Sequence, residues 1–474
     1  MEQLPVELLH VVCEKFHLHD LKRFRLVNKT WAAVGKKYLL PEALYFFHPL
    51  GCERLRETAD HSEFRFHVKS LLYDGRYIHQ EFTDRGEWEK NLKRRDFLAA
   101  VVGRNIDSAE IYAPPSDISQ EGNNAFEFES SADRWFRRHP ESVIHRTEEE
   151  LEKHYQIYLK TLEKQDEMWR DNWDFDAIAY AVKRFPTLKS VRLSTNRFIY
   201  GYHRLRDAAF KEAFADTFCK PGANNRSGID PPQGLRQLTA LLTAISDAEI
   251  KLDRVEAGCL SWRFFAQEES IMRRMVQATR FVTKINLLLD TAVDEDDIQL
   301  DFEGAECREY LSHGSLCRFL QNMPNLTSLK VIFDIEFEPD IVLPATIPDI
   351  VGHGTKWPKL EEFGVGGIAA KEADLLAFLD DHKDTLRRLT IKTIMLDAGE
   401  SWISTFPKIQ QTLSLDEASL FGVLCAGDST AQIEESWDIG EDKYSEDPVR
   451  QELARYLVEG GQCPLYLSNM HFRD

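Results

Sequence analysis

Several features are missing from this chain of 474 residues, and each absence excludes a class of protein. No apolar run approaches the roughly 18 residues that a membrane-spanning helix needs. The N-terminus lacks a basic stretch followed by a long apolar core, so we expect no secretory signal. The eight cysteines are scattered without a CxxC pair, which is typical of reduced thiols in a large intracellular protein. We therefore expect a protein of the cytoplasm, the nucleus or both.

Signatures of catalysis and of cofactor binding are also missing. The chain has no GxSxG elbow, no GxxxxGK[ST] phosphate loop, no HExxH, and no GxGxxG after a strand-like segment. We therefore expect no enzymatic activity, no catalytic residues, no cofactor and no metal site. An enzyme whose site lies under an unfamiliar motif remains an alternative.

Positive charge is in the minority, with 59 Lys and Arg against 79 Asp and Glu and a net charge of −20. Nucleic acids and anionic membranes bind clustered basic side chains, so we expect neither as a partner. Residues 1–48 differ from the rest, because they hold seven Lys or Arg and five Asp or Glu, a net charge of +2. A mildly basic segment on an acidic chain would suit an acidic partner. Ordinary solvated helix faces are at least as good an explanation.

The first forty residues carry the most specific pattern in the chain. They open with Leu4-Pro5-Val6-Glu7-Leu8-Leu9, continue with Leu21, and end with Leu26-Val27-Asn28-Lys29-Thr30-Trp31. Pro5 favours a helix start, because the N–H that proline lacks would have no partner there. Asp20 and Asn28 are suitable caps for a second and a third helix. Helices this short are marginal alone, so we expect them to share one small core.

This order and spacing resembles the F-box, a three-helix module that docks a protein onto the Skp-type adaptor of a cullin–RING ubiquitin ligase. The resemblance implies an F-box over residues 1–45. It implies an adaptor-binding surface made of Leu4, Pro5, Leu8, Leu21, Val27 and Trp31. The alternative is that these side chains are merely the core of a small helical module.

A connecting region over residues 46–170 is expected to follow. Val68 to Tyr73 has the composition of a strand. Thr147 and Glu150 form a capping-box pattern that predicts the start of a long helix, with an apolar face that includes Leu151, Tyr158 and Leu162. We expect this helix to bridge the N-terminal module and the body.

The body, residues 171–425, shows an irregular repeat of the form apolar-x-x-apolar-x-apolar. The six copies are Leu188/Val191/Leu193, Leu252/Val255/Ala257, Val282/Ile285/Leu287, Leu326/Leu329/Val331, Leu360/Phe363/Val365 and Leu386/Leu389/Ile391. Each unit would supply one strand and one helix and would bury its apolar face only by stacking on its neighbours.

This pattern resembles leucine-rich repeats, which implies an α/β fold with an irregular solenoid of strand–helix units. The steps between copies, 26 to 64 residues, depart from the roughly 20–29 of regular repeats. An asparagine follows the third apolar position only once, as Asn196. A compact α/β domain without a true horseshoe is the alternative. Residues 426–474 are expected to form an acidic C-terminal segment, with a solvated arm at residues 434–447.

Together the two resemblances, similar to fungal F-box proteins, imply the substrate-recognition subunit of an SCF-type ubiquitin ligase. Its partners would be the Skp-type adaptor, through it a cullin, and an unknown protein substrate. The substrate would contact strand residues between the apolar positions: Lys189, Arg192, Thr327 and Lys330. An F-box scaffold that binds the adaptor without any ubiquitination role is the other alternative.

Overall fold

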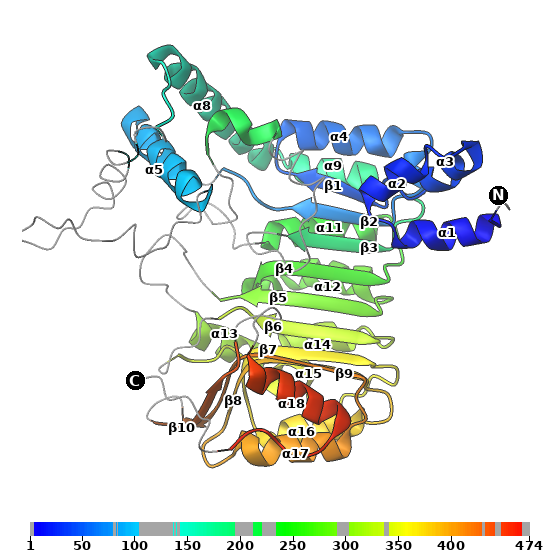
Figure 1. Cartoon of the computed structure of the whole chain (residues 1–474), viewed down its shortest axis with the longest axis vertical. Coiled ribbons are helices and arrows are strands. Elements are labelled where there is room, and N and C mark those ends of the chain that lie inside the picture. Colours follow the sequence, from blue (N-terminus) through cyan, green and yellow to red (C-terminus); the bar gives the residue numbers. More distant parts are fainter. Residues whose placement is uncertain are drawn as a thin grey trace, which may run out of the picture. The chain divides into compact units, whose positions relative to one another are not determined.

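The computed structural model describes residues 4–78, 82, 84–103, 136, 139, 143–194, 212–219, 234–291, 303–335, 341–428, 432–440 and 447–466. Within these ranges the chain is a mixed α/β protein with one open ten-stranded sheet (Figure 1), which confirms the predicted α/β class. Its contacts divide it into two units. The first comprises Met1–Tyr77, Asp171–Tyr202 and Gly222–Asp474, and the second comprises Ile78–Arg170 and His203–Pro221.

The sheet belongs to the first unit, and its spatial order is the order of the sequence. The strands are β1 (Glu42–Phe46), β2 (Ser70–Asp74), β3 (Ser190–Ser194), β4 (Arg254–Ser261), β5 (Lys284–Asp290), β6 (Ser328–Phe333), β7 (Glu362–Ala370), β8 (Arg388–Leu396), β9 (Glu417–Asp428) and β10 (Gln432–Asp438). β1 to β9 are parallel, whereas β10 is antiparallel to β9. The six apolar triplets of the sequence lie at β3 to β8, one at each strand.

Helices connect successive strands and cover one face of this sheet (Figure 1). The helices of the first unit are α1 (Val6–Lys15), α2 (Leu18–Phe24), α3 (Lys29–Lys36), α4 (Pro49–Asp60), η1 (Phe64–Phe66), α9 (Trp173–Val182), α11 (Leu235–Asp247), η4 (Trp262–Ala266), α12 (Glu269–Thr279), α13 (Gly304–Ser312), α14 (Ser315–Gln321), α15 (Ile347–Val351), α16 (Glu372–Asp381), α17 (Trp402–Thr412) and α18 (Pro448–Glu459). Against them the strands present side chains such as Val191, Leu329 and Ile391, all fully buried.

One backbone pattern aligns the starts of the parallel strands. The carbonyl just before a strand accepts two N–H groups from the start of the next strand, at 2.7–3.2 Å. The eight accepting residues are Pro41, Lys69, Lys189, Asp253, Thr283, Thr327, Glu361 and Arg387. These bonds satisfy backbone groups that a repeated asparagine would otherwise satisfy. Asn196, where the sequence has such an asparagine, lies outside the described residues.

A second regularity is a left-handed residue two positions after the last apolar residue of three triplets and, in β9, two positions after Leu420. Cys259, Gly367, Thr393 and Gly422 have φ angles of 51°, 67°, 45° and 79°. The residues two positions before them are paired along the sheet register, which places the four bends in one row. At Gly422 a Cβ atom would lie 2.1 Å from Thr393 Oγ1, so only glycine fits there.

The C-terminal edge differs from the predicted acidic segment. β9 runs across residue 425, the expected end of the body, and α18 packs against it. The interpretation of residues 434–447 as a solvated arm is wrong for their first part, because β10 buries Glu435 and Trp437. Glu435 accepts hydrogen bonds from the Ser401 hydroxyl and the Trp402 N–H, both at 2.6 Å, at the start of α17. A carboxylate there is favoured by the helix dipole.

The second unit contains α5 (Arg85–Gly103), α8 (Glu148–Arg170) and η3 (Ala215–Thr217). The predicted capping box of α8 is confirmed: the Thr147 N–H donates to Glu150 Oε2 at 2.8 Å, and the Glu150 N–H donates to Thr147 Oγ1 at 3.2 Å. The Trp88 indole N–H donates to the Thr217 carbonyl, which ties η3 to α5. Whether α8 bridges the N-terminal module and the body stays a prediction, as do the domain boundaries.

Buried His382 couples the stability of the first unit to pH. Its Nε2 accepts the Trp357 N–H at 3.0 Å, so its Nδ1 donates to the Phe378 carbonyl at 2.8 Å, and the ring is neutral. Burial lowers the pKa of His382. The unfolded chain therefore binds more protons than the folded chain near pH 6, and stability falls as the pH falls from about 7 towards 5.

We expect His382→Leu to lower the free energy of unfolding by about 1–3 kcal/mol at pH 7.5, because the Trp357 N–H loses its acceptor. The same variant should lose stability less steeply than the native chain between pH 7 and 5. Urea unfolding at several pH values measures both effects. An identical pH slope in the two proteins would show that His382 does not titrate on unfolding.

Candidate functional site

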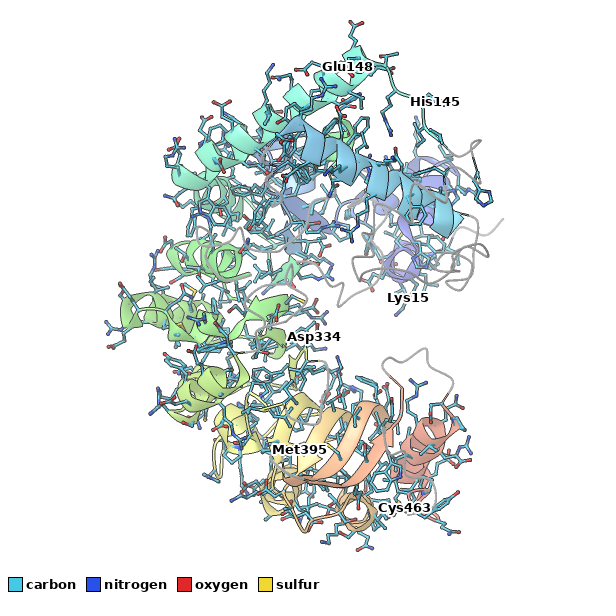
Figure 2. All side chains as sticks on the ribbon, turned by 90° about the vertical axis from the view of Figure 1, so that its left-hand side faces the viewer. Lys15, His145, Glu148, Asp334, Met395 and Cys463 are labelled. Atoms are coloured by element: carbon cyan, nitrogen blue, oxygen red, sulfur yellow. The ribbon has the colours of Figure 1, made fainter. Side chains whose placement is uncertain are left out.

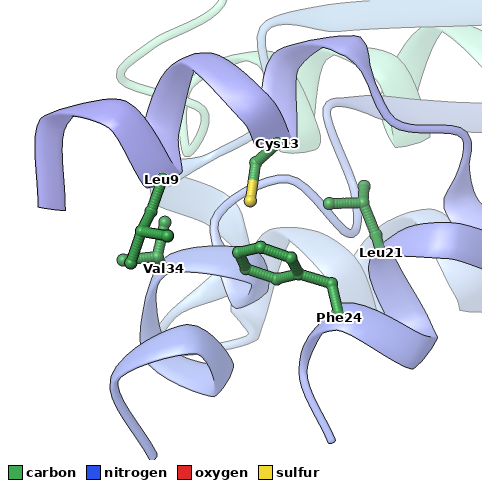
Figure 3. Close-up of a cluster of buried hydrophobic side chains, with 5 residues drawn as sticks. All are labelled: Leu9, Cys13, Leu21, Phe24 and Val34. Atoms are coloured by element: carbon green, nitrogen blue, oxygen red, sulfur yellow. The ribbon is translucent and has the colours of Figure 1, made fainter. Parts of the chain in front are cut away.

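The N-terminal helices form a small module with a core of its own. Leu9 and Cys13 of α1 point towards Leu21 and Phe24 of α2 and towards Val34 of α3 (Figure 3). These five side chains are at most 6% exposed. The Asn28 side chain accepts the Trp31 N–H at 3.0 Å, so it caps α3 as predicted. The predicted shared core is therefore confirmed.

The structure divides the six predicted adaptor-binding residues into two groups. Leu4, Pro5, Leu8 and Val27 are exposed, with Leu8 and Val27 at 49% and 57%. Leu21 is only 3% exposed and belongs to the core, so it supports the surface from below. Trp31 is half-buried and stacks on Phe24, with 4.5 Å between ring centroids.

Other exposed apolar side chains accompany the predicted ones. Val6 and Val11 of α1 and Phe16 after it are exposed, and Leu26, beside Val27, is 85% exposed. We call the seven exposed side chains Leu4, Val6, Leu8, Val11, Phe16, Leu26 and Val27 the apolar surface. The sequence pattern singled out only three of them, because helical periodicity identifies the inward side of a helix and leaves the outward side unassigned.

The polar face of the sheet, opposite the helices, is the second candidate surface. Figure 2 shows side chains on both sides of the strands, and it labels Asp334 at the end of β6. Lys330 and Gly364 are paired in register on this face, and Lys330 passes over Gly364, where an added Cβ would lie 2.8 Å from its Cγ. A hollow of about 160 Å³ lies beside them, and its lining includes Lys284 and Asn286 of β5.

Two of the predicted substrate-binding residues are held by ion pairs on this face. Arg192 donates to Glu42 and to Glu256, each at 2.8 Å. Lys330 lies 2.5 Å from Glu362, which also accepts the Ser328 hydroxyl at 2.8 Å. The side chains of Arg192 and Lys330 are therefore held in place by carboxylates on neighbouring strands.

The other two predicted residues lie at the strand starts. The Lys189 and Thr327 carbonyls belong to the row that accepts paired N–H groups, and the Thr327 hydroxyl donates to the Thr283 carbonyl at 3.1 Å. Lys189 is exposed and lies 4.0 Å from Asp253. Lys284 is also exposed, and the described residues offer it no ion-pair partner. It is a better candidate for a ligand contact than Lys330.

The ion pairs of Glu362 favour its ionised form. Burial tends to raise the pKa of Glu362, but Lys330, Ser328 and Arg388 outweigh it, and the net effect is a lowered pKa. The unfolded chain therefore takes up a proton at a higher pH than the folded chain does. The stabilisation is present above about pH 4.3, the ordinary pKa of glutamate, and is lost as the pH falls through the folded pKa.

We expect Glu362→Gln to lower the free energy of unfolding by about 1–3 kcal/mol at pH 7, because Lys330 and Arg388 lose their carboxylate. The difference from the native chain should shrink as the pH falls from 5 to 3. Glu417→Gln is the matched control in the same row of the sheet, since Glu417 is exposed and forms no ion pair with the described residues. Equal losses in both variants would contradict the role given to Glu362.

Among the described residues, no group of three or more His, Cys, Asp and Glu side chains is placed to hold a metal ion. Their helices also include none that combines the length and apolar character of a membrane span. Seven cysteines are buried and none is in a disulfide. Comparison of the sequence with models of protein families and with curated proteins found no match.

Proposed function

We propose that this protein is the substrate-recognition subunit of an SCF-type cullin–RING ubiquitin ligase. In this proposal the N-terminal module is an F-box that docks onto a Skp-type adaptor through the apolar surface. The body binds the protein substrate, in the cytoplasm or the nucleus. The observation that carries the proposal is the apolar surface itself: seven large side chains are exposed within residues 4–27, on a module whose core has only five buried members.

Such a surface is costly to leave in water. Burying a fully exposed leucine or valine is worth about 1.5–3 kcal/mol, so a partner that covers several of these side chains gains substantial affinity. Leu8 and Val11, both exposed, lie about one helical turn apart in α1. This spacing suits the groove of a helical partner, which receives side chains one turn apart. Leu26 and Val27, which lie just before α3, would add further apolar contacts with the same partner.

The arrangement of the sheet supports a body of the leucine-rich-repeat type. Nine parallel strands follow one another in sequence order, each connected through helical segments to the next. A solenoid of strand–helix units would have this order, because each unit contacts only its neighbours. The polar face, with Arg192, Lys284 and Lys330, is then the surface proposed to meet the substrate. Holding a substrate there raises the local concentration of its lysines near the ligase's ubiquitin-carrying enzyme.

We expect the double variant Leu8→Asp/Val27→Asp to bind a purified Skp-type adaptor at least about thirtyfold more weakly than the native chain. Each position loses its apolar contact and places a carboxylate at the interface, and a truncated hot-spot residue alone costs about 2 kcal/mol. Both side chains are exposed, so the fold should be unchanged. Titration calorimetry and circular dichroism on the full chain measure binding and folding.

Val458→Asp is the matched control, because Val458 is an exposed valine on α18, far along the chain from the apolar surface. This variant should bind the adaptor as the native chain does. Adaptor binding retained by the folded double variant, or absent from the folded native chain, would overturn the proposed docking role.

A scaffold without a ubiquitination role would bind the adaptor in the same way, so a second readout is needed. We expect cells that carry the native chain to contain ubiquitinated peptides that disappear with Leu8→Asp/Val27→Asp and persist with Val458→Asp. Quantitative mass spectrometry of ubiquitin remnants checks this. Adaptor binding with no such difference would favour the scaffold.

A further inference from the structure

A basic pocket lies between α3 of the N-terminal module and the segment around η1. Its volume is about 600 Å³, and its lining includes Arg25, Lys36, Lys37, Phe66 and His67. The apolar surface and the polar face of the sheet contribute none of its lining residues. The pocket thus belongs to neither of the surfaces used in the proposed function.

The cations of this basic pocket have few anionic neighbours. Lys36 pairs with Glu63, the acidic residue of the lining. Among the residues that the structure describes, Arg25 and Lys37 have no ion-pair partner, and the Arg25 Nε is buried without a hydrogen-bond acceptor. Leaving a charged donor unpaired in this way costs free energy, and an anionic ligand would remove the cost.

The packing of Arg25 holds its guanidinium in place. Its aliphatic stem lies on Gly35 of α3, where an added Cβ would come within 2.7 Å of the Arg25 Cγ. Gly35 is therefore the residue that lets the arginine pass along the helix. A pre-positioned guanidinium loses less side-chain entropy when it binds an anion than a mobile one does.

The positive charge is concentrated enough to affect His67. Burial, followed by the nearby Lys37, Lys36 and Lys69, lowers the pKa of His67. The lining holds two ammonium groups and a guanidinium, and Lys69 lies close to His67, on a chain of net charge −20. The local field therefore opposes the field of the whole molecule and favours an anion at this place.

We propose that this basic pocket binds a phosphate monoester. A guanidinium with clustered ammonium groups matches a phosphate, which carries a charge of about −1.5 to −2 at pH 7 and three acceptor oxygens. A carboxylate, which carries a single negative charge, would neutralise less of the pocket's positive charge. The pocket, at about 600 Å³, is also larger than a bare phosphate. The exposed Phe66 ring and Ala33 supply an apolar wall for the organic part of the ester.

The test is titration calorimetry of the full native chain in a phosphate-free buffer at low ionic strength. Phenyl phosphate is the probe, and phenyl sulfate is its control of similar shape and about half the charge. We expect saturable binding of phenyl phosphate, at least about tenfold tighter than that of phenyl sulfate. No saturable binding of phenyl phosphate, or equal affinities for the two probes, would overturn the proposal.

Two variants locate the binding. Arg25→Gln/Lys37→Gln should weaken phenyl phosphate binding at least about tenfold, because two charged donors are lost. Lys37→Gln/Lys69→Gln changes only exposed side chains and should weaken it severalfold with the fold intact. Lys15→Gln/Lys22→Gln removes the same charge from exposed positions of the N-terminal helices outside the pocket lining, and it should leave the affinity within about twofold. Equal losses in all three pairs would show that general attraction, and not this pocket, binds the probe.

A final comparison separates two sources of the ester. A short peptide with one phosphoserine is titrated beside phenyl phosphate. Tighter binding of the peptide, with the same dependence on Lys37 and Lys69, assigns the pocket to phosphorylated protein segments. Tighter binding of phenyl phosphate assigns it to a small phosphate ester. These measurements need no adaptor, so their outcome is independent of the docking proposal.

Discussion

The structure of the first unit depends on one constraint, the common starting line of its parallel strands. A single carbonyl oxygen before each strand accepts two N–H groups of the next strand, and this holds from Pro41 to Arg387. Because side chains alternate along a strand, a slip of one residue would turn every apolar triplet outward. The buried apolar triplets specify the register, and the backbone bonds satisfy the polar groups along the starting line. One continuous core and one continuous polar face follow from the same alignment.

The two candidate surfaces differ in how the fold produces them. The N-terminal module is too small to bury all its apolar side chains, so Leu8, Leu26 and Val27 remain in water. The polar face is made by the register, which places residues of distant sequence in rows and lets Arg192 reach Glu42 and Glu256. The first surface offers apolar area, and the second offers fixed charges. A receptor with two different partners would need this contrast.

Much of the fold could be predicted from sequence because the local signals were strong. The triplets at β3 to β8 and the capping box at Thr147 are short-range patterns, so the sequence predicts them directly. The segment Leu415/Ala418/Leu420 at β9 has the same form as the six triplets, and like Leu252/Val255/Ala257 it includes an alanine. The sequence does not predict β10, because a charged residue usually indicates an exposed position. Glu435 instead points inward and caps α17. The ion pairs of Arg192 join residues 64 and 150 positions apart, and no local pattern reports such distances.

The antiparallel strand β10 has a consequence for the nascent chain, because β10 is made after all the parallel strands. Each parallel strand can pair with the strand before it as it leaves the ribosome, but its own free edge then waits for the next strand. Among the described strands, only β10 reverses direction and ends this succession, and its register with β9 is irregular between Ile433 and Glu435. Open strand edges are sites of aggregation. A nascent chain that stalls before residue 432 would therefore present the edge of β9 to other chains, so β10 protects the strands made earlier.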